Sequence, residues 1–281
     1  MLATVGDLVD DIVVRLRGPI HVATDTDAVI ERRHGGSAAN VAVAAARIRG
    51  GSRFLGQVGH DARGAMLLTE LAAKGVDVSA VRRAGRTGSI VVLVDAAGER
   101  SFLTDPGSAR DLDDPLPEWL DGVEVLHVPL YSLVGGAIAT TSRTMIRWSH
   151  ARGIAVSIDL SSVAVIESIG ADELRQWLED LAPHVVFANA DEARTMGVHA
   201  AFGQALTIVK SGPDAVKVFG TSPEPLEVPA RLLPSVVDST GAGDAFAAGV
   251  LTYPGWRDEP EAACNAGHRA AARVLGAREL N

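Results

Sequence analysis

From Val123 to the C-terminal region, short apolar segments alternate with amphipathic ones, and this alternation constrains the fold most strongly. Apolar runs of strand length at 155–159 and 185–188 are followed by helical patterns at 171–181 and 191–196. Parallel strands need a crossover connection and are buried on both faces, so the pattern predicts a mainly parallel sheet flanked by helices. Further strands are expected at 123–129, 205–210 and 215–219, and further helices at 139–152 and 261–274.

The composition agrees with such a sheet and excludes several classes of protein. Aromatic residues make up only 4% of the chain, so the core must be built from Ala, Val, Leu and Ile. We expect residues 1–281 to form a single domain. A net charge of −9 without a basic, aromatic-interleaved patch argues against a nucleic-acid partner. The lone Cys264, and a sequence with no signal-peptide or membrane-span pattern, predict a cytoplasmic protein without a membrane partner.

The N-terminal part of the chain predicts a second, smaller group of strands. Strand patterns occur at 2–5, 12–16, 89–94 and 100–104, and the turn residues at 96–99 join the last two as a hairpin. Small-residue and amphipathic helices are expected at 37–48 and 62–74. The hairpin is separate in sequence from the alternating units, so it predicts a small sheet beside the main one.

The run Asp238-Ser239-Thr240-Gly241-Ala242-Gly243-Asp244 carries the clearest chemistry. It leads into the small apolar series 245–251, so its tiny residues fall where a helix begins, and the first-turn N–H groups there can bind an anion. A carboxylate such as Asp244 inside an anion site is unfavourable unless it takes up a proton or works through a metal. The pattern therefore predicts a base that deprotonates a hydroxyl while the helix end holds the developing charge.

Two N-terminal motifs could bind a polyhydroxy ligand. The run Gly35-Gly36-Ser37-Ala38-Ala39-Asn40 precedes an Ala-rich helix, and its paired glycines allow a ligand close to the backbone while the Asn40 amide suits a sugar diol. Taken alone, the run fits a capped, tightly packed helix better than a ligand site. The acids Asp7, Asp10 and Asp11 follow the first strand and could bind hydroxyls or a metal, or form a solvated acidic turn.

Three polar residues fall at the carboxyl ends of predicted strands, where open α/β sheets bind ligands: Asp159, Asn189 and Lys210. Asn189 and Glu192 are three residues apart and share a face of a starting helix, so their oxygens could hold Mg²⁺ through water. A helix cap followed by a first-turn acid would give the same pattern. Lys210 and Gly212 could border a nucleotide or form an ordinary turn.

Together and in this order, these motifs resemble the ribokinase-like (PfkB-type) carbohydrate kinases, from Gly6 to Gly276. The most specific matches are 238–244 and 35–40, and the run 57–64 also fits. The resemblance implies a ribokinase-like, doubly wound sheet flanked by helices, with a small β-sheet lid drawn from about 11–34 and 86–106. It also implies an ATP-dependent phosphotransferase that acts on a hydroxyl of a small sugar or sugar-like substrate.

The family's functional positions carry over residue by residue. Asp244 would be the catalytic base, and the backbone of Gly241, Ala242 and Gly243 would form the anion hole. The sugar would be contacted by Asp11, Gly35, Gly36 and Asn40, with Asp7 and Arg100 as further candidates. The nucleotide would be contacted by Lys210, Gly212, Asn265 and Asn189. Mg²⁺ would lie near Glu192 and Asn189, held through water, and a monovalent cation such as K⁺ near Asp238 and Thr240.

The resemblance also implies a homodimer, because two lids that pair would cover the open edges of their strands. Several positions depart from the family pattern: Lys210-Ser211 replaces a small residue followed by an apolar one, Ala215 replaces a glycine, the segment 197–203 is short, and Ser37 replaces a lysine of ribokinase proper. The first three departures lie on the nucleotide side of the site. The sequence therefore indicates the reaction more clearly than it indicates which phosphate donor is used. The fourth argues against assuming ribose as the acceptor.

Two alternatives to a sugar kinase stay open on the sequence. A nucleoside kinase of the same fold would need a slot for a base, and Phe102, Trp119 and Tyr131 are the aromatic candidates in the N-terminal half. A non-catalytic sugar- or nucleotide-binding relative would bind ligand without turnover. The intact Asp244 and the small residues before it argue against the second alternative.

Overall fold

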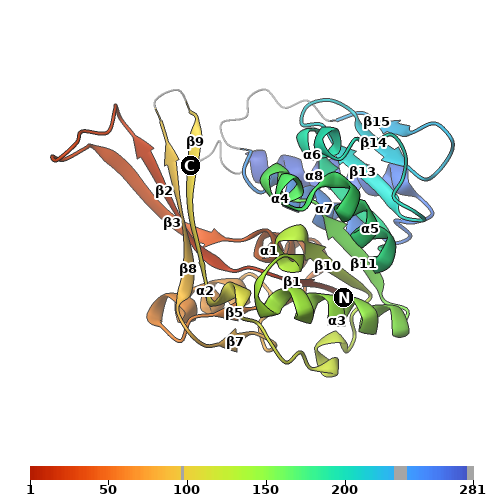
Figure 1. The fold of residues 1–281 in the computed structure, drawn as a ribbon, viewed down its shortest axis with the longest axis horizontal. Coiled ribbons are helices and arrows are strands. Elements are labelled where there is room, and N and C mark those ends of the chain that lie inside the picture. Colours follow the sequence, from red (N-terminus) through yellow and green to blue (C-terminus); the bar gives the residue numbers. More distant parts are fainter. Residues whose placement is uncertain (96–97, 231–238, 277–281) are drawn as a thin grey trace.

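A large twisted sheet runs through the centre of the molecule, and a smaller sheet stands beside it (Figure 1). The computed structural model describes residues 1–95, 98–230 and 239–276. Within these residues, the large sheet has the order β15 (Leu226–Val228), β14 (Val216–Phe219), β13 (Leu206–Lys210), β12 (Val185–Asn189), β11 (Ala155–Asp159), β10 (Val125–Pro129), β1 (Leu2–Val5), β4 (Ser52–Leu55) and β6 (Val76–Asp77). A short pair, β5 (Gln57–Val58) and β7 (Arg82–Arg83), lies separately.

The pairing in the large sheet is parallel from β6 to β13, and β14 and β15 add an antiparallel edge. β1 lies between β10 and β4, so the order of the strands reverses beside it. In open α/β sheets, ligands bind outside the carboxyl ends of the strands at such a reversal. The doubly wound, mainly parallel sheet predicted from the sequence is confirmed.

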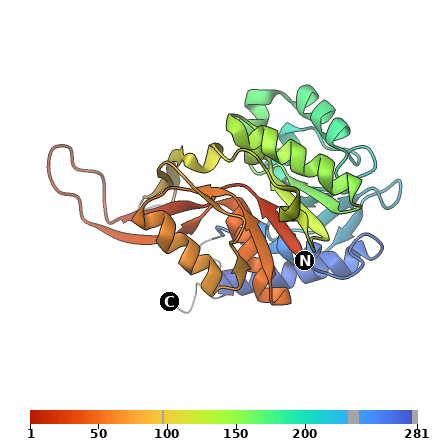
Figure 2. The same cartoon turned by 90° about the horizontal axis from the view of Figure 1, so that it is seen from below.

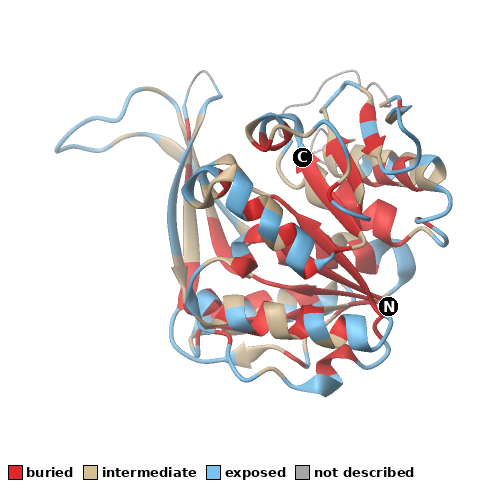
Figure 3. Ribbon diagram, turned by 45° about the vertical axis from the view of Figure 1, so that its right-hand side comes forward, coloured by how far each residue is buried: buried red, intermediate tan, exposed pale blue. Residues whose placement is uncertain are grey.

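Helices cover both faces of this sheet, and each face has its own apolar core (Figure 3). Successive side chains of a strand point to opposite faces. In β12, Val186 packs into one core while Val185 and Phe187 pack into the other. The first core lies under α3 (Gly136–Ala151), α4 (Val163–Ile169), α5 (Ala171–Leu181) and α6 (Ala190–Thr195). The second lies under α1 (Ser37–Arg49), α7 (Ala242–Leu251) and α8 (Pro260–Gly276), and α2 (Ala62–Ala73) packs beside α1.

Small side chains let α1 and α7 approach each other closely. The buried faces of these helices include Ala38, Ala42 and Ala45 on α1 and Ala247 and Ala248 on α7. Gly249 of α7 has no room for a side chain, because a Cβ there would lie 2.7 Å from the backbone of α8. This close packing brings the N-terminal ends of two helices from distant parts of the sequence to the same place.

The small sheet projects from the body as a lid (Figures 1 and 2). Its order is β3 (Ala28–Gly35), β2 (Val9–Leu16), β8 (Thr87–Val94) and β9 (Arg100–Gly107), with β2 and β8 parallel. The two strands of the expected hairpin form the antiparallel pair β8–β9, and residues 96–97 of its expected turn lie outside the described residues. We define the inner face of the lid as the one that carries Asp11, and the outer face as the one that carries Ile12.

Some elements had a weak sequence signal. β3 contains Glu31, Arg32 and Arg33, and such charges hide a strand pattern. The structure explains them through cross-strand partners: Arg32 pairs with Asp10, and Arg33 pairs with Asp11. The 3₁₀ helices 108–110, 117–120 and 130–133 complete the described elements. No helix in the described part of the chain is long and apolar enough to cross a bilayer.

Candidate active site

The N-terminal end of α7 meets the N-terminal end of α1 beside the carboxyl ends of the parallel strands. Gly241 caps α7 with a φ of +77°, a conformation that favours glycine. The N–H of Ala242 donates to the carbonyl of Ser239 (3.1 Å), so it is already used within the turn. The N–H groups of Gly243 and Asp244 have no backbone acceptor within the described residues. These two amides are therefore the donors that α7 offers to an anion.

The carboxylate of Asp244 is held by two donors from α1. Ser37 Oγ donates to Oδ1 (2.8 Å), and Asn40 Nδ2 donates to Oδ2 (2.9 Å). Burial raises the pKa of Asp244 to about 6; the two hydrogen bonds oppose this shift, and the charge of Asp159 adds to it. The result is a positioned carboxylate that is ionised at neutral pH and more basic than a solvated aspartate.

A buried ion pair lies next to this helix end. Lys210 Nζ contacts Asp159 Oδ2 at 2.7 Å, and both side chains are largely buried. A Cβ built on Gly243 would lie 3.4 Å from Lys210 Nζ, so the ammonium group approaches the first turn of α7. Burial acts to lower the pKa of Lys210, but the attraction of Asp159 outweighs it and raises the pKa above its usual value. Lys210 therefore stays protonated and brings its ammonium group to the helix end, where the charge of Asp159 opposes it.

The glycine pair before α1 makes room for the backbone after β1. Gly36 caps α1 with a φ of +105°, and a Cβ there would lie 2.3 Å from the carbonyl oxygen of Asp7. A Cβ on Gly35 would lie 2.8 Å from the Cβ of Asp11. Asp7 Oδ1 accepts a long hydrogen bond from the N–H of Ala38 (3.5 Å), and burial raises the pKa of Asp7. The glycines are required by close contacts with the protein itself, which fits the alternative of a tightly packed helix, and the approach of a ligand to them stays a prediction.

Asp11 lies buried on the inner face of the lid. Its Oδ2 accepts from Arg33 Nε at 2.7 Å. Its Oδ1 is buried and has no hydrogen-bond partner within the described residues. A buried carboxylate oxygen without a donor is costly. Asp11 therefore has an oxygen that can accept a hydrogen bond from a ligand hydroxyl, and its contact with sugar stays a prediction.

A cavity of about 130 Å³ lies between the inner face of the lid and the ends of α1 and α7. Its polar lining consists of Asp11, Arg15, Arg33, Asn40, Arg100 and Thr240. Its apolar lining consists of Val13, Ile90, Val92, Val94 and Phe102, with Gly35 and Gly36 beside them. The volume suits a small ligand, because pockets for drug-sized molecules measure about 300–1,000 Å³. Of the three aromatic candidates for a base slot, Phe102 lines this cavity.

The predicted Mg²⁺ residues form a helix cap. Asn189 Oδ1 accepts from the N–H groups of Asp191 and Glu192, and Glu192 accepts in return from Asn189 N (2.8 Å) and Nδ2 (2.7 Å). Burial, together with the charge of Asp159, raises the pKa of Glu192 to about 7. Both carboxylate oxygens of Glu192 have a partner, so a cation would meet this group through water. No cluster of three or more metal-ligating side chains occurs among the described residues.

The other predicted positions lie on both sides of α7. Arg100 Nη1 donates to Thr240 Oγ1 (2.9 Å), which ties the lid to the turn before α7. Thr240 was predicted as part of a cation site, and its partner Asp238 lies outside the described residues. Gly212 follows β13 with a φ of +61°, and Asn265 is half-buried on α8. The structure brings Asp244, Asn40, Thr240 and Arg100 together with the cavity.

Sequence reasoning missed several residues of this site. Ser37 was noted only as a departure from ribokinase, but it donates directly to Asp244. Arg15 and Arg33 line the cavity and carried no motif of their own. The alternation along β2 could have found Arg15, because it lies four residues after Asp11 and so on the same face. Asp159 was noted at the end of a predicted strand, but no role was predicted for it.

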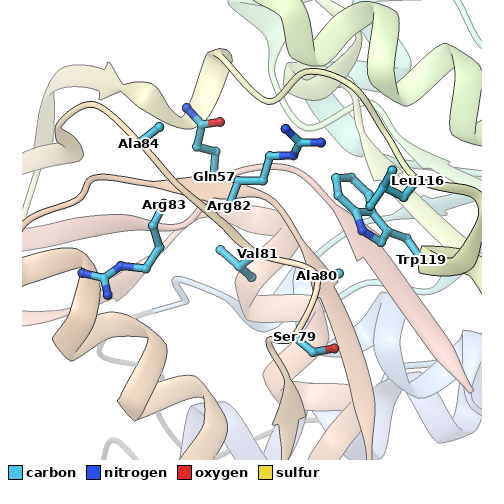
Figure 4. A pocket seen from close by; sticks show the side chains of 9 residues that line it. All are labelled: Gln57, Ser79, Ala80, Val81, Arg82, Arg83, Ala84, Leu116 and Trp119. Atoms are coloured by element: carbon cyan, nitrogen blue, oxygen red, sulfur yellow. The ribbon is translucent and has the colours of Figure 1, made fainter.

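A larger cavity of about 440 Å³ lies elsewhere, between β5, β7 and the 3₁₀ helix 117–120 (Figure 4). None of the predicted site residues lines it. Arg82 and Arg83 point in opposite directions from β7, and the guanidinium of Arg82 stacks over Trp119, 5.5 Å from the ring centre. Arg82 also donates to the carbonyl of Asp114. Trp119, a candidate for a base slot, thus faces this second cavity and not the one beside Asp244.

Comparison with known proteins agrees with the geometry. The profile of the pfkB family carbohydrate kinases matches residues 1–281. A fructokinase of Escherichia coli is 34% identical over 243 residues, which cover 78% of this chain and 76% of that protein. An ATP-dependent ribose-1-phosphate kinase of Halopiger xanaduensis is 32% identical over 228 residues, 77% of this chain and 72% of that protein.

A solved structure shares the whole architecture. The adenosine kinase from Sinorhizobium meliloti superposes with a TM-score of 0.83 at 24% identity, covering 98% of this chain and 93% of that one. At this identity the likeness shows the fold alone. The family profile and the curated relatives carry the assignment further, since they match in sequence over most or all of the chain. This protein belongs to the pfkB family of carbohydrate kinases.

Proposed function

We propose that the enzyme transfers the γ-phosphoryl group of ATP to a hydroxyl of a small sugar, with Asp244 as the general base. The observation that carries the proposal is the double support of Asp244 by Ser37 and Asn40 at the start of α7. Phosphoryl transfer needs in-line positioning, a base and charge neutralisation. Asp244 would take the proton from the hydroxyl as its oxygen attacks phosphorus.

The developing negative charge would lie against the end of α7. The N–H groups of Gly243 and Asp244 point from a helix N-terminus, which carries partial positive charge. The ammonium of Lys210 approaches the same turn. Preorganised donors of this kind lower the barrier because they need no reorientation during the reaction. We therefore assign Lys210 to the phosphoryl group itself, in addition to its predicted place near the nucleotide.

The buried carboxylates of Glu192 and Asp159 favour ATP bound with Mg²⁺. Glu192 and Asp159 repel each other in a buried place, and a divalent cation held through water near Asn189 and Glu192 would relieve that repulsion. Bound Mg²⁺ would supply further positive charge to the phosphates. Gly212 and Asn265 would border the nucleotide. A K⁺ site near Thr240 and Asp238 stays a prediction, which replacing K⁺ by tetramethylammonium in the assay would test.

The pH dependence of the reaction should follow Asp244. A base must be ionised to accept a proton, and the pKa of Asp244 is about 6. We expect kcat/KM to rise about tenfold per pH unit below this value and to level off above it. Rates measured between pH 5 and 8 at saturating Mg²⁺ test this expectation. A flat profile down to pH 5 would argue that Asp244 is not the base.

We also propose that the enzyme is a homodimer paired through the outer faces of the lids. Directly paired residues of neighbouring strands share a face, so Ile12, Val14, Ile30, Val91 and Leu103 lie together on this outer face. Ile30 and Leu103 are 63% and 59% exposed, which is high for such side chains. A second copy of the chain would cover both this apolar face and the strand edges.

Sedimentation velocity tests the dimer. We expect a mass of two chains for the wild type and of one chain for Ile30→Asp. The matched control is Met66→Asp, which adds the same charge at an equally exposed apolar residue on α2 (60% exposed) and should leave the dimer intact. A monomeric wild type would remove the proposal.

An ADP-release screen tests the proposed function as a whole. The acceptors are pentoses, hexoses, keto-deoxy sugar acids and nucleosides, each with ATP, Mg²⁺ and K⁺ present. Nucleosides belong in the screen because Phe102 lines the cavity and could stack on a base. ADP release that depends on one class of acceptor supports the proposal. Ligand binding without ADP release from any acceptor would favour a non-catalytic relative.

A further inference from the structure

The larger cavity, of about 440 Å³ between β5, β7 and the 3₁₀ helix 117–120, lies outside the proposed active site. Its volume falls within the range of about 300–1,000 Å³ that small-molecule sites usually have. Gln57 and Trp119 in its floor are buried, and Arg83 and Leu116 at its rim are exposed. None of its lining residues also lines the cavity under the lid. A ligand bound here would therefore be separate from the acceptor.

The side-chain amide of Gln57 faces this cavity without a partner. Gln57 is only 6% exposed, and its amide forms no hydrogen bond with any residue that the structure describes. In Figure 4 the amide projects from β5 on the same side as the guanidinium of Arg82. A buried amide that finds no partner in the protein costs free energy. A ligand in the cavity can supply that partner.

Arg82 brings a positive charge to the same side of the strands. Gln57 and Arg82 are directly paired between β5 and β7, so their side chains share a face and their backbones lie about 4.8 Å apart. Arg82 donates to the carbonyl of Asp114 and stacks over Trp119, but no carboxylate in the described ranges pairs with it. A guanidinium has five N–H donors, so most of those of Arg82 still need an acceptor.

The wall opposite the strands is held in place by two other arginines. Arg53 Nη1 donates to the carbonyl of Trp119 (2.9 Å), and Arg152 Nη1 donates to the carbonyl of Pro117 (2.8 Å). These hydrogen bonds fix the 3₁₀ helix that carries the ring of Trp119. A preformed site has less conformational freedom to lose when a ligand binds. The cavity is thus part of the folded structure before any ligand enters it.

The lining defines the chemistry of a suitable ligand. Arg82 and Arg83 are charged, and no acid is among the lining residues, although the chain as a whole carries a net charge of −9. A guanidinium and a neighbouring amide N–H can donate together to one carboxylate or phosphate group. Val81, Leu116 and Trp119 offer apolar surface beside these donors. The lining therefore suits a molecule with an anionic group and an apolar part.

We propose that this cavity binds a small organic anion whose carboxylate or phosphate group is held by Arg82 and Gln57. The apolar part of the ligand would rest against Val81, Leu116 and the ring of Trp119. The lining contains no carboxylate, histidine or cysteine that could act as a base or a nucleophile, so the ligand is bound without being converted. This site goes beyond the proposed kinase function and does not depend on it.

Calorimetric titration of the wild-type protein with two pairs of probes tests the proposal. The pairs are benzoate with benzamide, and phenyl phosphate with phenol, so the ring stays while the anionic group is replaced by a neutral one. We expect at least one anion to bind about tenfold or more tightly than its neutral partner, because hydrogen bonds to charged groups are the stronger ones. The two pairs show which anionic group the site takes. No binding of either anion at millimolar concentration, or equal binding of the neutral partners, would overturn the proposal.

The variant Gln57→Leu assigns the binding to this cavity. Leucine is similar in size but has no N–H group, so the affinity for the anion should fall about tenfold. The fold should be retained, because the amide of Gln57 has no partner in the described protein. Gln204→Leu is the matched control, since it makes the same change at an exposed glutamine outside the lining and should bind like the wild type. Wild-type affinity in Gln57→Leu would contradict the proposal.

A second variant tests the role of the charge. Arg82→Gln should abolish the preference for the anion over its neutral partner, whereas Arg17→Gln, which removes the same charge from an exposed side chain outside the lining, should keep it. An unchanged preference in Arg82→Gln would remove this arginine from the site. If Arg82→Gln does not fold, the result for Gln57→Leu decides.

Competition with ATP separates this site from the active site. Saturating ATP should leave the affinity for the anion unchanged, because the two cavities share no lining residue. Displacement of both anions by ATP would place them in the active site and overturn the proposal. None of these measurements requires turnover. A kinase that fails to bind the anions, or a protein that binds them without kinase activity, therefore tells the two proposals apart.

Discussion

Replacing Asp244 by Asn is expected to lower kcat by about three orders of magnitude or more while ATP still binds. The change removes the base but keeps a side chain of the same shape between Ser37 and Asn40. The N–H groups at the start of α7 and the ammonium of Lys210 remain in place, so the nucleotide should still bind. Steady-state ADP release measures kcat, and calorimetry with ATP measures binding. Near-normal turnover would remove Asp244 from its proposed role.

The stability of this variant separates a lost base from a lost fold. The pKa of Asp244 is raised in the folded protein, so its contribution to stability is fully present below the unfolded pKa, near 3.8. That contribution is lost as the pH rises through about 6, because the folded site must then hold a buried charge. At pH 7.5, the substitution Asp244→Asn should therefore leave the melting temperature unchanged or raise it.

A matched control tests whether any first-turn acid would behave in this way. Asp172 lies in the first turn of α5, far in the fold from the cavity, and Asp172→Asn makes the same chemical change there. We expect full activity from this variant and a slight loss of stability, since an acid favours a helix N-terminus. A large kinetic loss at both positions would point to a general effect on the helices instead of catalysis.

The fold could be predicted because its determinants are local in sequence. Apolar strands such as Ala155–Asp159 and the small-residue helix Ser37–Arg49 carry their pattern within a few residues. β3 could not be read in the same way, because its charged residues are explained only by partners on β2. Cross-strand pairing joins residues 22 positions apart, and no local pattern records it.

The site could be predicted only in part, for a related reason. Motifs marked Asp244 and Asn40 separately, but their hydrogen bond joins residues 204 positions apart. The sequence pointed to a metal at Asn189 and Glu192, and the structure shows how fully the same pair satisfies a helix cap. The ammonium group of Lys210, close to α7, illustrates best what a local sequence pattern does not record. Lys210 looked like a departure on the nucleotide side, and only the packing of β13 against α7 brings its ammonium to Gly243.

Replacing Lys210 by Met should therefore have the second large effect. The ammonium is expected to stabilise the transferring phosphoryl group, and removing one such preorganised group costs about 10²–10³ in kcat. The variant should also be less stable, because Asp159 is 5% exposed and would lose its partner in a buried place. Breaking a buried ion pair from one side costs about 3–5 kcal/mol. Steady-state kinetics and thermal unfolding measure the two effects separately.

The double variant Lys210→Met/Asp159→Asn decides which effect explains the loss of activity. It removes the unpaired buried carboxylate, so most of the lost stability should return. If Lys210 acts on the phosphoryl group, kcat stays low in the double variant, because no positive charge approaches Gly243. If Lys210 serves only to neutralise Asp159 near Glu192 and Asp244, the double variant should recover activity together with stability. We expect the first outcome, since the Nζ atom of Lys210 lies 2.7 Å from Asp159 and also faces the turn where the charge of the reaction develops.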